Sequence, residues 1–451
     1  MLSLTEKNAA VLAFSGICAK TFDFAFRTYY SVRLGTEGVG LLALGFGLHG
    51  VMLTVATAGL GVATSKIVSE YLEQKEYGAV RQSMKIAVYG VACLSLLIIL
   101  LTFAGADIIA RYVLGDARIS LGLCCLAPSI LFMGISYCLK GYFYAARKAW
   151  IPAGSEFLEQ GVKFASISVL LMIFLPRGIS YGCAAVFAGI SIGEFSSCLY
   201  LTLFFLREVL AMKKGENRRG IPLAIIKISL PSMLSSFAGS ALRMQEEVWI
   251  VNAFKGFGYN HADAVSALGV MYGMVMPMLV FPLTIAGSVT TLLVPEIARR
   301  NTLSDKSRLV GLVKRVYRAG FIAGMAVLAV FEVFAEPLAG FLYHDTSITV
   351  WIKVLAWLCP VMFADTLSCA MLNGLGKQFS LLFYSISDSL IRLALIFAFV
   401  PIFGMTALAG VIVISNLYTC TLSVGRVVHC VGGVRRGIGK SRFGQNTLRS
   451  R

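Results

Sequence analysis

The chain has 451 residues, of which 57% are hydrophobic and only 14% are charged, and its mean hydropathy is +0.79. Soluble domains carry about 25% charged residues, so this composition excludes a water-soluble globular protein and indicates a polytopic membrane protein. The net charge of +17 would suggest a nucleic-acid partner in a soluble chain. Here its distribution predicts membrane topology instead, and we expect no nucleic-acid partner.

Twelve apolar segments are long enough to cross a membrane. An apolar helix needs about 20 residues to span roughly 30 Å of hydrocarbon. The segments therefore predict an all-α polytopic membrane protein with twelve transmembrane helices. They are centred near residues 20, 51, 95, 129, 168, 194, 237, 279, 323, 361, 391 and 414.

The basic residues of the connecting loops predict the orientation. If the N-terminus is cytoplasmic, 29 Lys and Arg residues fall on the inner side and six on the outer side. The positive-inside rule then places both termini in the cytoplasm of a bacterial plasma membrane. The same basic loops favour contact with anionic membrane lipids.

The cysteines and histidines do not suggest a redox or metal centre. The eleven cysteines lie almost wholly inside apolar segments without a CxxC pair, as expected for small buried side chains. The four histidines are scattered, so we predict neither a metal site nor a cofactor. The first apolar segment lacks a small-residue cleavage pattern and is expected to remain in the mature protein.

The most polar interruption between spans leaves six spans on either side, and a repeated spacing supports this division. In each half a cation at an inner loop is followed by an acid and a base four residues apart on the next helix. Both halves start on the same side, which is typical of transporters whose substrate path lies between two parallel repeats. The triplets are Lys148, Glu159, Lys163 and Lys377, Asp388, Arg392. The predicted domains are a six-helix lobe at 1–206, a cytoplasmic linker at 207–227, a second six-helix lobe at 228–430 and a basic cytoplasmic tail at 431–451.

Two spans carry residues that bend helices. The span near 279 contains Pro277 and Pro282, and residues 48–64 contain three glycines. Such bends suit a gate that rocks open and shut, and ordinary kinks filled by neighbouring side chains explain them equally well.

Charges inside the first span identify a candidate site. Lys20, Asp23 and Arg27 follow an i, i+3, i+7 spacing and so lie on one helical face. Each charge facing lipid at the helix centre costs about 2.5 to 3.5 kcal/mol. Each Leu, Ile or Phe of the segment stabilises insertion by only about 0.3 to 0.6 kcal/mol, which does not offset the three charges. These residues are therefore predicted to face a wet cavity or one another.

A second charged face lies on the first helix of the second half. Arg243, Glu246 and Glu247 are predicted to meet the face of the first helix, together with Asp365, in a central substrate cavity. Two internally balanced pairs near helix ends are predicted to be structural or coupling pairs. They are Glu159 with Lys163 and Asp388 with Arg392.

Several stretches resemble the stage V sporulation protein B group of oligosaccharide flippases, related to lipid II flippases and to multidrug and toxin extrusion (MATE) antiporters. The likeness covers nearly the whole chain. The stretches are residues 35–71, LKGYFYA at 139–145, residues 243–247, residues 274–299 (with PEIAR), residues 365–378 (with NGLGK) and SDSLIRLAL at 387–395.

The resemblance implies a MATE-like, V-shaped bundle of two lobes that exports a polyprenyl-pyrophosphate-linked oligosaccharide or peptidoglycan precursor by alternating access. Such proteins serve polysaccharide or cell wall biosynthesis and sporulation, and similar flippases carry cavity cations where Lys20 and Arg27 stand. Many relatives have fourteen spans, and the extra two are associated with a groove for the lipid tail. How a protein with twelve spans accommodates the lipid tail is therefore an open question.

Three other functions are alternatives. The acids within the spans favour a multidrug antiporter of the MATE type, coupled to H⁺ or Na⁺. A membrane enzyme normally needs a sizeable loop or domain with acid, base or metal-binding groups. No loop here exceeds about 25 residues, so we expect no catalytic residues. A non-transporting scaffold for envelope assembly is the remaining alternative.

Overall fold

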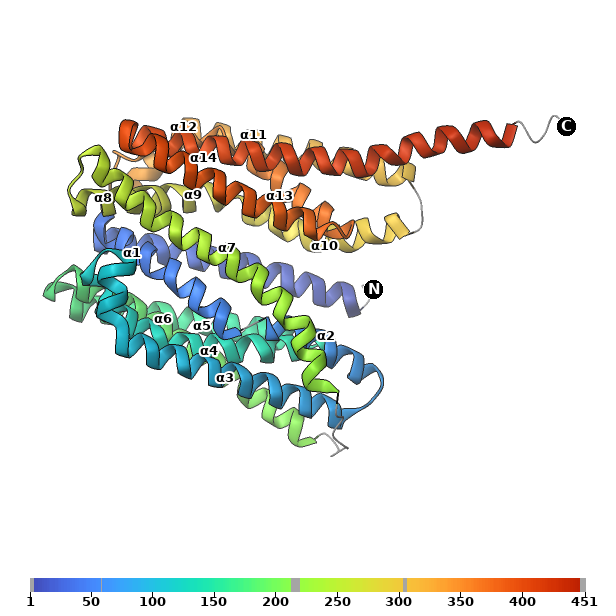
Figure 1. Ribbon diagram of the computed structural model, residues 1–451, viewed down its shortest axis with the longest axis horizontal. Helices are drawn as coiled ribbons and strands as arrows, with labels where there is room; N and C mark the ends of the chain where they lie inside the picture. Colours follow the sequence, from blue (N-terminus) through green and yellow to red (C-terminus); the bar gives the residue numbers. More distant parts are fainter. Residues whose placement is uncertain (1–3, 58, 212–219, 303–305, 447–451) are drawn as a thin grey trace. The chain divides into compact units, whose positions relative to one another are not determined.

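The structure is a computed structural model that describes residues 4–57, 59–211, 220–302 and 306–446 (Figure 1). Within these residues the chain is helical and contains no strand. The helices form two compact units, unit 1 at Met1–Met276 and unit 2 at Pro277–Arg451. Each unit is described separately below. The predicted boundary at the 207–227 linker remains a prediction, and part of that linker lies outside the described residues.

Unit 1 begins with one long helix, α1, which bends at Gly35. The later helices α7 and α8 also belong to this unit, because they pack against α1. Two π-helical turns, η1 and η4, interrupt the regular hydrogen bonding. The elements are α1 (Leu4–Thr57), α2 (Leu60–Glu73), α3 (Tyr77–Ile108), η1 (Ile109–Leu114), η2 (Ala117–Ile119), α4 (Ser120–Ala145), α5 (Trp150–Phe174), η3 (Leu175–Arg177), α6 (Ile179–Ala211), α7 (Ile221–Phe257), α8 (His261–Leu268) and η4 (Gly269–Val275), followed by α9 (Met276–Val280) at the boundary.

Unit 2 contains the remaining helices, and its longest helix bends at Gly404. The short helices α12 and α13 meet at an angle of 54° and together have the length of one span. The elements are α10 (Leu283–Thr302), α11 (Lys306–Tyr343), α12 (Thr349–Ala356), α13 (Cys359–Gly374) and α14 (Gln378–Asn446).

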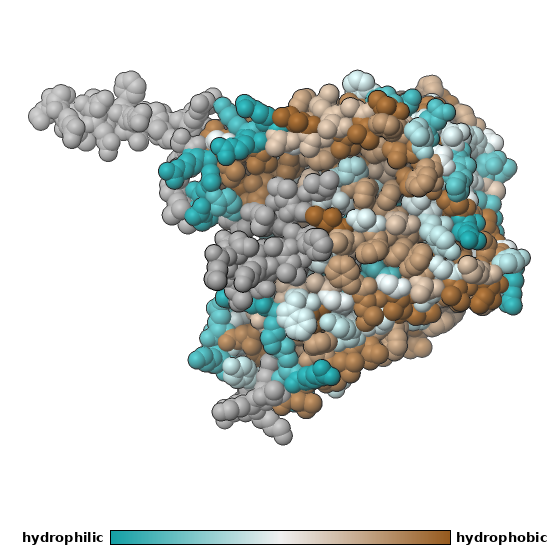
Figure 2. Space-filling model, turned by 180° about the vertical axis from the view of Figure 1, so that it is seen from behind, coloured by the Kyte–Doolittle hydropathy of each residue, from teal (hydrophilic) through white to brown (hydrophobic). Residues whose placement is uncertain are grey.

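The described helices agree with the predicted spans. Nine are long and apolar enough to cross a membrane within the described ranges, or ten if α12 and α13 form one span. The first and last of them each contain two helices joined at a kink, at Gly35 and at Gly404. Counting those halves separately is consistent with twelve spans. Figure 2 shows apolar side chains on the flanks of the helices and hydrophilic ones gathered toward their ends, as a bilayer requires.

The predicted bends are present, and their spacing repeats. The left-handed glycines Gly35 and Gly258 each end a helix segment. The chain breaks again 24 residues later in both cases, at left-handed Gly59 and at the turn containing Pro282. A left-handed φ suits glycine because it lacks a Cβ atom. The same pair of turns therefore occurs in both halves of the sequence.

The repeated triplets share their local geometry. The amide of Lys148 donates to the carbonyl of Phe143 at 2.9 Å, and that of Lys377 donates to Leu372 at 2.8 Å. In both turns the preceding residue has a left-handed φ, 58° at Arg147 and 71° at Gly376. This is the Schellman arrangement that ends a helix. The acid–base pairs that follow are both formed, Glu159 with Lys163 at 2.9 Å and Asp388 with Arg392 at 3.1 Å. These contacts support the internal repeat inferred from the spacing.

Glycines allow α1 to approach α8 and η4 closely inside unit 1. A Cβ atom on Gly40 would overlap the carbonyl oxygen of Val265, and one on Gly269 would overlap that of Thr36. Small residues at crossing points let helices in membranes gain packing contacts that larger side chains prevent. The close crossing fixes the position of α8 against the bend of α1.

Replacing Gly40 with Ala should lower the free energy of unfolding by about 1 to 3 kcal/mol, because the added methyl group overpacks this crossing. Gly50→Ala is the matched control on the same helix, since its Cβ would meet no atom within 4 Å. Thermal unfolding of both variants in detergent measures the difference. Equal stability of the two variants would show that the crossing is not close.

Candidate functional site

The charged face of α1 is only partly covered. Lys20 and Asp23 are exposed and Arg27 is half-buried, next to the hydroxyl of Tyr30. Aromatic contacts hold this part of α1 against α5, because the ring of Phe164 lies 4.9 Å from that of Phe26. The α1 face therefore has a fixed backbone but side chains that solvent or a ligand can reach.

A buried cluster of three charges joins α5 to α6. Lys163 lies 2.9 Å from Glu159 and 4.0 Å from Glu194, and both carboxylates are less than 10% exposed. Lys163 is also within electrostatic range of Asp23 on α1. The two helices come close at Gly193, where a Cβ atom would lie 2.9 Å from the Cβ of Lys163. The predicted Glu159–Lys163 pair is thus confirmed as an ion pair, but it has a third member.

Glu194 is the residue that the predicted site omits. The sequence signal was its position as an acid in the apolar segment near residue 194, directly after a glycine. Its partner lies on another helix, 31 positions away in the chain, so the spacing rules for a single helix could not identify the pairing.

The charged face of α7 lies beside α1 within unit 1. Glu246 is buried and accepts a hydrogen bond from Tyr272 Oη in η4 at 2.8 Å, while Arg243 is exposed. Glu247 packs over Gly47, and its Oε2 atom forms no hydrogen bond with the described part of the chain. Arg27 and Arg243 are both within electrostatic range of Glu247. The predicted meeting of the α1 and α7 faces agrees with these positions.

In unit 2 the acids pair with hydroxyl groups and a cation. Asp365 accepts a hydrogen bond from Ser423 at 2.6 Å. Asp388 accepts one from Ser415 at 2.6 Å and pairs with Arg392 at 3.1 Å. The two acids lie within electrostatic range of each other. The predicted place of Asp365 in a cavity with the α1 residues remains a prediction.

The charged residues in and around the α1–α7 site differ in burial. Lys20, Arg243 and Asp23 are exposed and Arg27 is half-buried. The carboxylates of Glu159, Glu194 and Glu246 are buried. Glu247 is half-buried like Arg27, so a molecule that reaches the accessible side chains meets three cations and two acids. The arrangement suits an anionic group that accepts charge-assisted hydrogen bonds.

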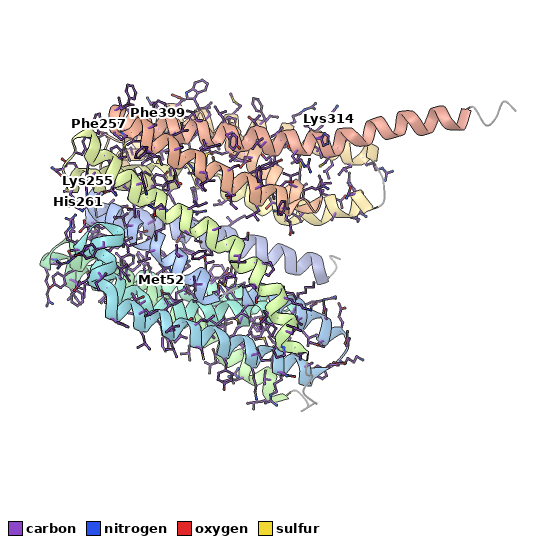
Figure 3. All side chains as sticks on the ribbon, in the orientation of Figure 1. Met52, Lys255, Phe257, His261, Lys314 and Phe399 are labelled. Carbon is purple, nitrogen blue, oxygen red and sulfur yellow. The ribbon has the colours of Figure 1, made fainter. Side chains whose placement is uncertain are left out.

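A second ionic cluster ties the loop between α3 and α4 to α1 and α8. Asp116 is 4% exposed and contacts Arg118 at 2.7 Å and His261 Nε2 at 2.8 Å. Arg118 also pairs with Glu37 of α1 at 2.5 Å. Figure 3 shows His261 near Lys255 and Phe257, where α7 ends and α8 begins. Burial opposes ionisation of Asp116, but hydrogen bonds from Arg118 and His261 outweigh it and hold the pKa of this carboxyl below its usual value.

These features define a multi-pass, all-α membrane protein with the fold of the MATE transporters. A multidrug resistance MATE family transporter in an inward-facing conformation superposes with a TM-score of 0.75 at 16% identity, covering 94% of this chain and 99% of that one. The chain belongs to the polysaccharide biosynthesis protein family, whose model matches residues 6–300. The superfamily resemblance found in the sequence is thus confirmed.

Three relatives extend the comparison. Stage V sporulation protein B of Bacillus subtilis is 25% identical over 92% of this chain and 83% of its own length. Multidrug export protein MepA of Staphylococcus saprophyticus is 21% identical over 82% of this chain and 80% of its own length. Lipid II flippase MurJ of B. subtilis is 20% identical over 84% of this chain and 74% of its own length.

Replacing Lys163 with Met should lower the free energy of unfolding by about 3 to 5 kcal/mol, because Glu159 and Glu194 are then buried without a cation. Lys20→Met, an exposed site, should change it by less than about 0.5 kcal/mol. Thermal unfolding in detergent measures both. A Lys163→Met protein as stable as Lys20→Met would contradict the buried cluster.

Asp116 should make stability depend on pH in the acidic range. Its folded-state pKa is lowered, so its contribution is present above the unfolded value of about 3.9 and is lost as pH falls through the folded value. At pH 7 Asp116→Asn should cost about 1 to 2 kcal/mol. The stability curves of wild type and variant should converge as the pH falls below the unfolded value of about 3.9. Parallel curves over that range would assign no such role to Asp116.

Proposed function

We propose that the chain is a flippase that moves a polyprenyl-pyrophosphate-linked oligosaccharide or peptidoglycan precursor across the bacterial plasma membrane by alternating access. The names of two relatives, stage V sporulation protein B and lipid II flippase MurJ, favour this substrate class. We propose transport rather than catalysis, in keeping with the MATE fold and with relatives named as an exporter and a flippase.

The observation that carries the proposal is the sign of the accessible charge. A pyrophosphate carries several negative charges and cannot enter hydrocarbon without partners. Lys20, Arg27 and Arg243 offer such partners, and they outnumber the accessible acids Asp23 and Glu247. The Arg27 guanidinium suits a pyrophosphate because its planar fork binds two oxygens at once. In this mechanism the prenyl chain remains in the lipid while the headgroup moves.

A cation-coupled multidrug antiporter is the second candidate, and the carboxylates of α7 favour it. Glu247 has a buried oxygen that is unpaired within the described residues, and the neighbouring Glu246 bonds Tyr272. A proton or Na⁺ could bind there. The same carboxylates could equally couple flipping to an ion gradient, so substrate identity is the property that separates the two functions.

Lys20→Ala and Arg27→Ala should each reduce flipping tenfold to a hundredfold, because one charge-assisted contact is worth about 1.5 to 3 kcal/mol. Arg27→Lys should lose less, since the charge remains. Arg33→Ala is the matched control: Arg33 is an exposed cation further along α1, beside the ring of Tyr29. The measurement is translocation of fluorescent polyprenyl-pyrophosphate oligosaccharide in proteoliposomes, with and without H⁺ or Na⁺ gradients.

Wild-type flipping by the Lys20→Ala and Arg27→Ala proteins would refute the role of these cations. Export of cationic drugs without any flipping, lost on Glu247→Gln, would establish the second candidate instead.

The proposal requires both termini to be cytoplasmic. On a cysteine-free background, a cysteine at Lys255 should react with an impermeant reagent added to intact cells, and one at Glu73 should not. Both residues are exposed. Lys255 is chosen rather than Gly258, which caps the same helix, because the φ of 110° at Gly258 disfavours any side chain. Reaction at Glu73 alone would invert the topology.

A further inference from the structure

A large cavity lined by both apolar surface and polar side chains lies in unit 1, away from the charged α1–α7 site. Its volume is about 830 Å³, within the range of pockets that hold small organic ligands. It lies along most of α2, beside the last turns of α4 and the beginning of α5, on the side that the predicted topology places in the cytoplasm. Its lining residues are Gly61, Ser65, Lys66, Ser69 and Glu70 of α2, Tyr137, Lys140, Gly141 and Tyr144 of α4, and Glu156 of α5.

Two glycines build the base of this cavity. A Cβ atom on Gly141 would lie 2.8 Å from the carbonyl oxygen of Gly61, so α2 and α4 cross here with their backbones nearly in contact. A Cβ atom on Gly61 would lie 2.6 Å from Cδ1 of Tyr137, so this ring packs on the bare glycine backbone. Tyr137 is nevertheless 56% exposed. The ring is therefore held in place while much of its surface is open to a ligand.

Helical spacing aligns the remaining groups along the cavity. Tyr137 and Tyr144 are seven residues apart on one face of α4, and Ser65 and Ser69 are four apart on one face of α2. Two aromatic rings and two hydroxyls thus line the same space. Aromatic faces next to hydroxyl groups provide both an apolar surface and hydrogen-bonding partners.

The charges in the cavity balance. Lys140 pairs with Glu156 at 3.4 Å, and Lys66 and Glu70 lie four residues apart on α2, both exposed. Two cations and two acids give the lining no net charge. A pyrophosphate would need a net positive lining, and a prenyl chain would cover the charged and hydroxyl groups of the lining without giving them hydrogen-bonding partners. An uncharged molecule with many hydroxyl groups fits this lining better than either.

We propose that this cavity binds the uncharged sugar portion of the substrate, with Tyr137 stacking on a sugar ring. The inference rests on the proposed flippase function, and it assigns sugar selectivity to a site separate from the cations that would hold the pyrophosphate. The cavity volume is large enough for a short oligosaccharide, not only for a small alcohol.

The test measures binding of N,N′-diacetylchitobiose and of inorganic pyrophosphate to the full chain in nanodiscs, by saturation-transfer difference NMR. The variants are Tyr137→Ala, Tyr137→Phe and Ser69→Trp, the last filling the cavity without removing the Tyr137 packing. Tyr89→Ala is the matched control, because Tyr89 is also an exposed tyrosine of unit 1 but does not line the cavity. Circular dichroism and thermal unfolding verify folding of each variant.

The disaccharide should bind in the millimolar range, and Tyr137→Ala and Ser69→Trp should each weaken it about tenfold or more. Tyr137→Phe and Tyr89→Ala should bind as wild type does, and pyrophosphate binding should respond to Lys20→Ala but not to these variants. Absence of disaccharide binding, or binding unaffected by Ser69→Trp, would overturn the inference. So would pyrophosphate binding that is lost on Lys66→Gln.

Flipping assays keep this failure distinct from failure of the proposed function. Flipping that persists without sugar binding at the cavity refutes the inference alone. Sugar binding that depends on Tyr137 in a protein that flips no lipid-linked sugar refutes the function alone.

Discussion

A charge within a membrane-spanning helix must either meet a counter-charge or reach water, because the alternative costs several kcal/mol for each group. Unit 1 meets this constraint in both ways. Lys163 is covered and sits between Glu159 and Glu194, whereas Lys20 remains exposed. The close helix contacts at Gly193 and at Gly40 bring the partners into range. The small residues therefore allow the close helix packing that the charged pairs need.

The sequence predicted the fold well because its signals are local. Apolar length locates spans, and glycine and proline mark the breaks observed at Gly59 and Pro282. The i, i+4 spacing likewise predicted the Asp388–Arg392 ion pair, which is an intrahelical contact. Helical periodicity gives the face on which a residue lies but not the residue on the neighbouring helix. For that reason the Glu194–Lys163 and Glu246–Tyr272 contacts could not be predicted.

The internal repeat preserves geometry while its chemistry differs. Both triplets follow the same Schellman turn and form the same ion pair. In unit 1 the partner on the following helix is the carboxylate Glu194, whereas Asp388 in unit 2 meets the hydroxyl of Ser415. The first cluster carries one more acid than base, and so does the second when Asp365, within electrostatic range of Asp388, is counted with the Asp388–Arg392 pair.

Burial, rather than residue type, decides which intramembrane cations can serve a substrate. Lys163 and Lys20 are chemically identical, but two buried carboxylates neutralise the charge of Lys163, so it is not available to a ligand. Arg392 is similarly engaged with Asp388. Among the intramembrane cations, Lys20 and Arg243 are exposed and Arg27 is half-buried, so these three are the ones that an incoming headgroup can reach. Arg27 and Arg243 share Glu247 as a neighbour, so protonation of that carboxylate would strengthen the local positive field, and an anion bound there would favour the protonated form. In the proposed flippase, anion binding and protonation of Glu247 would therefore be linked through this electrostatic contact.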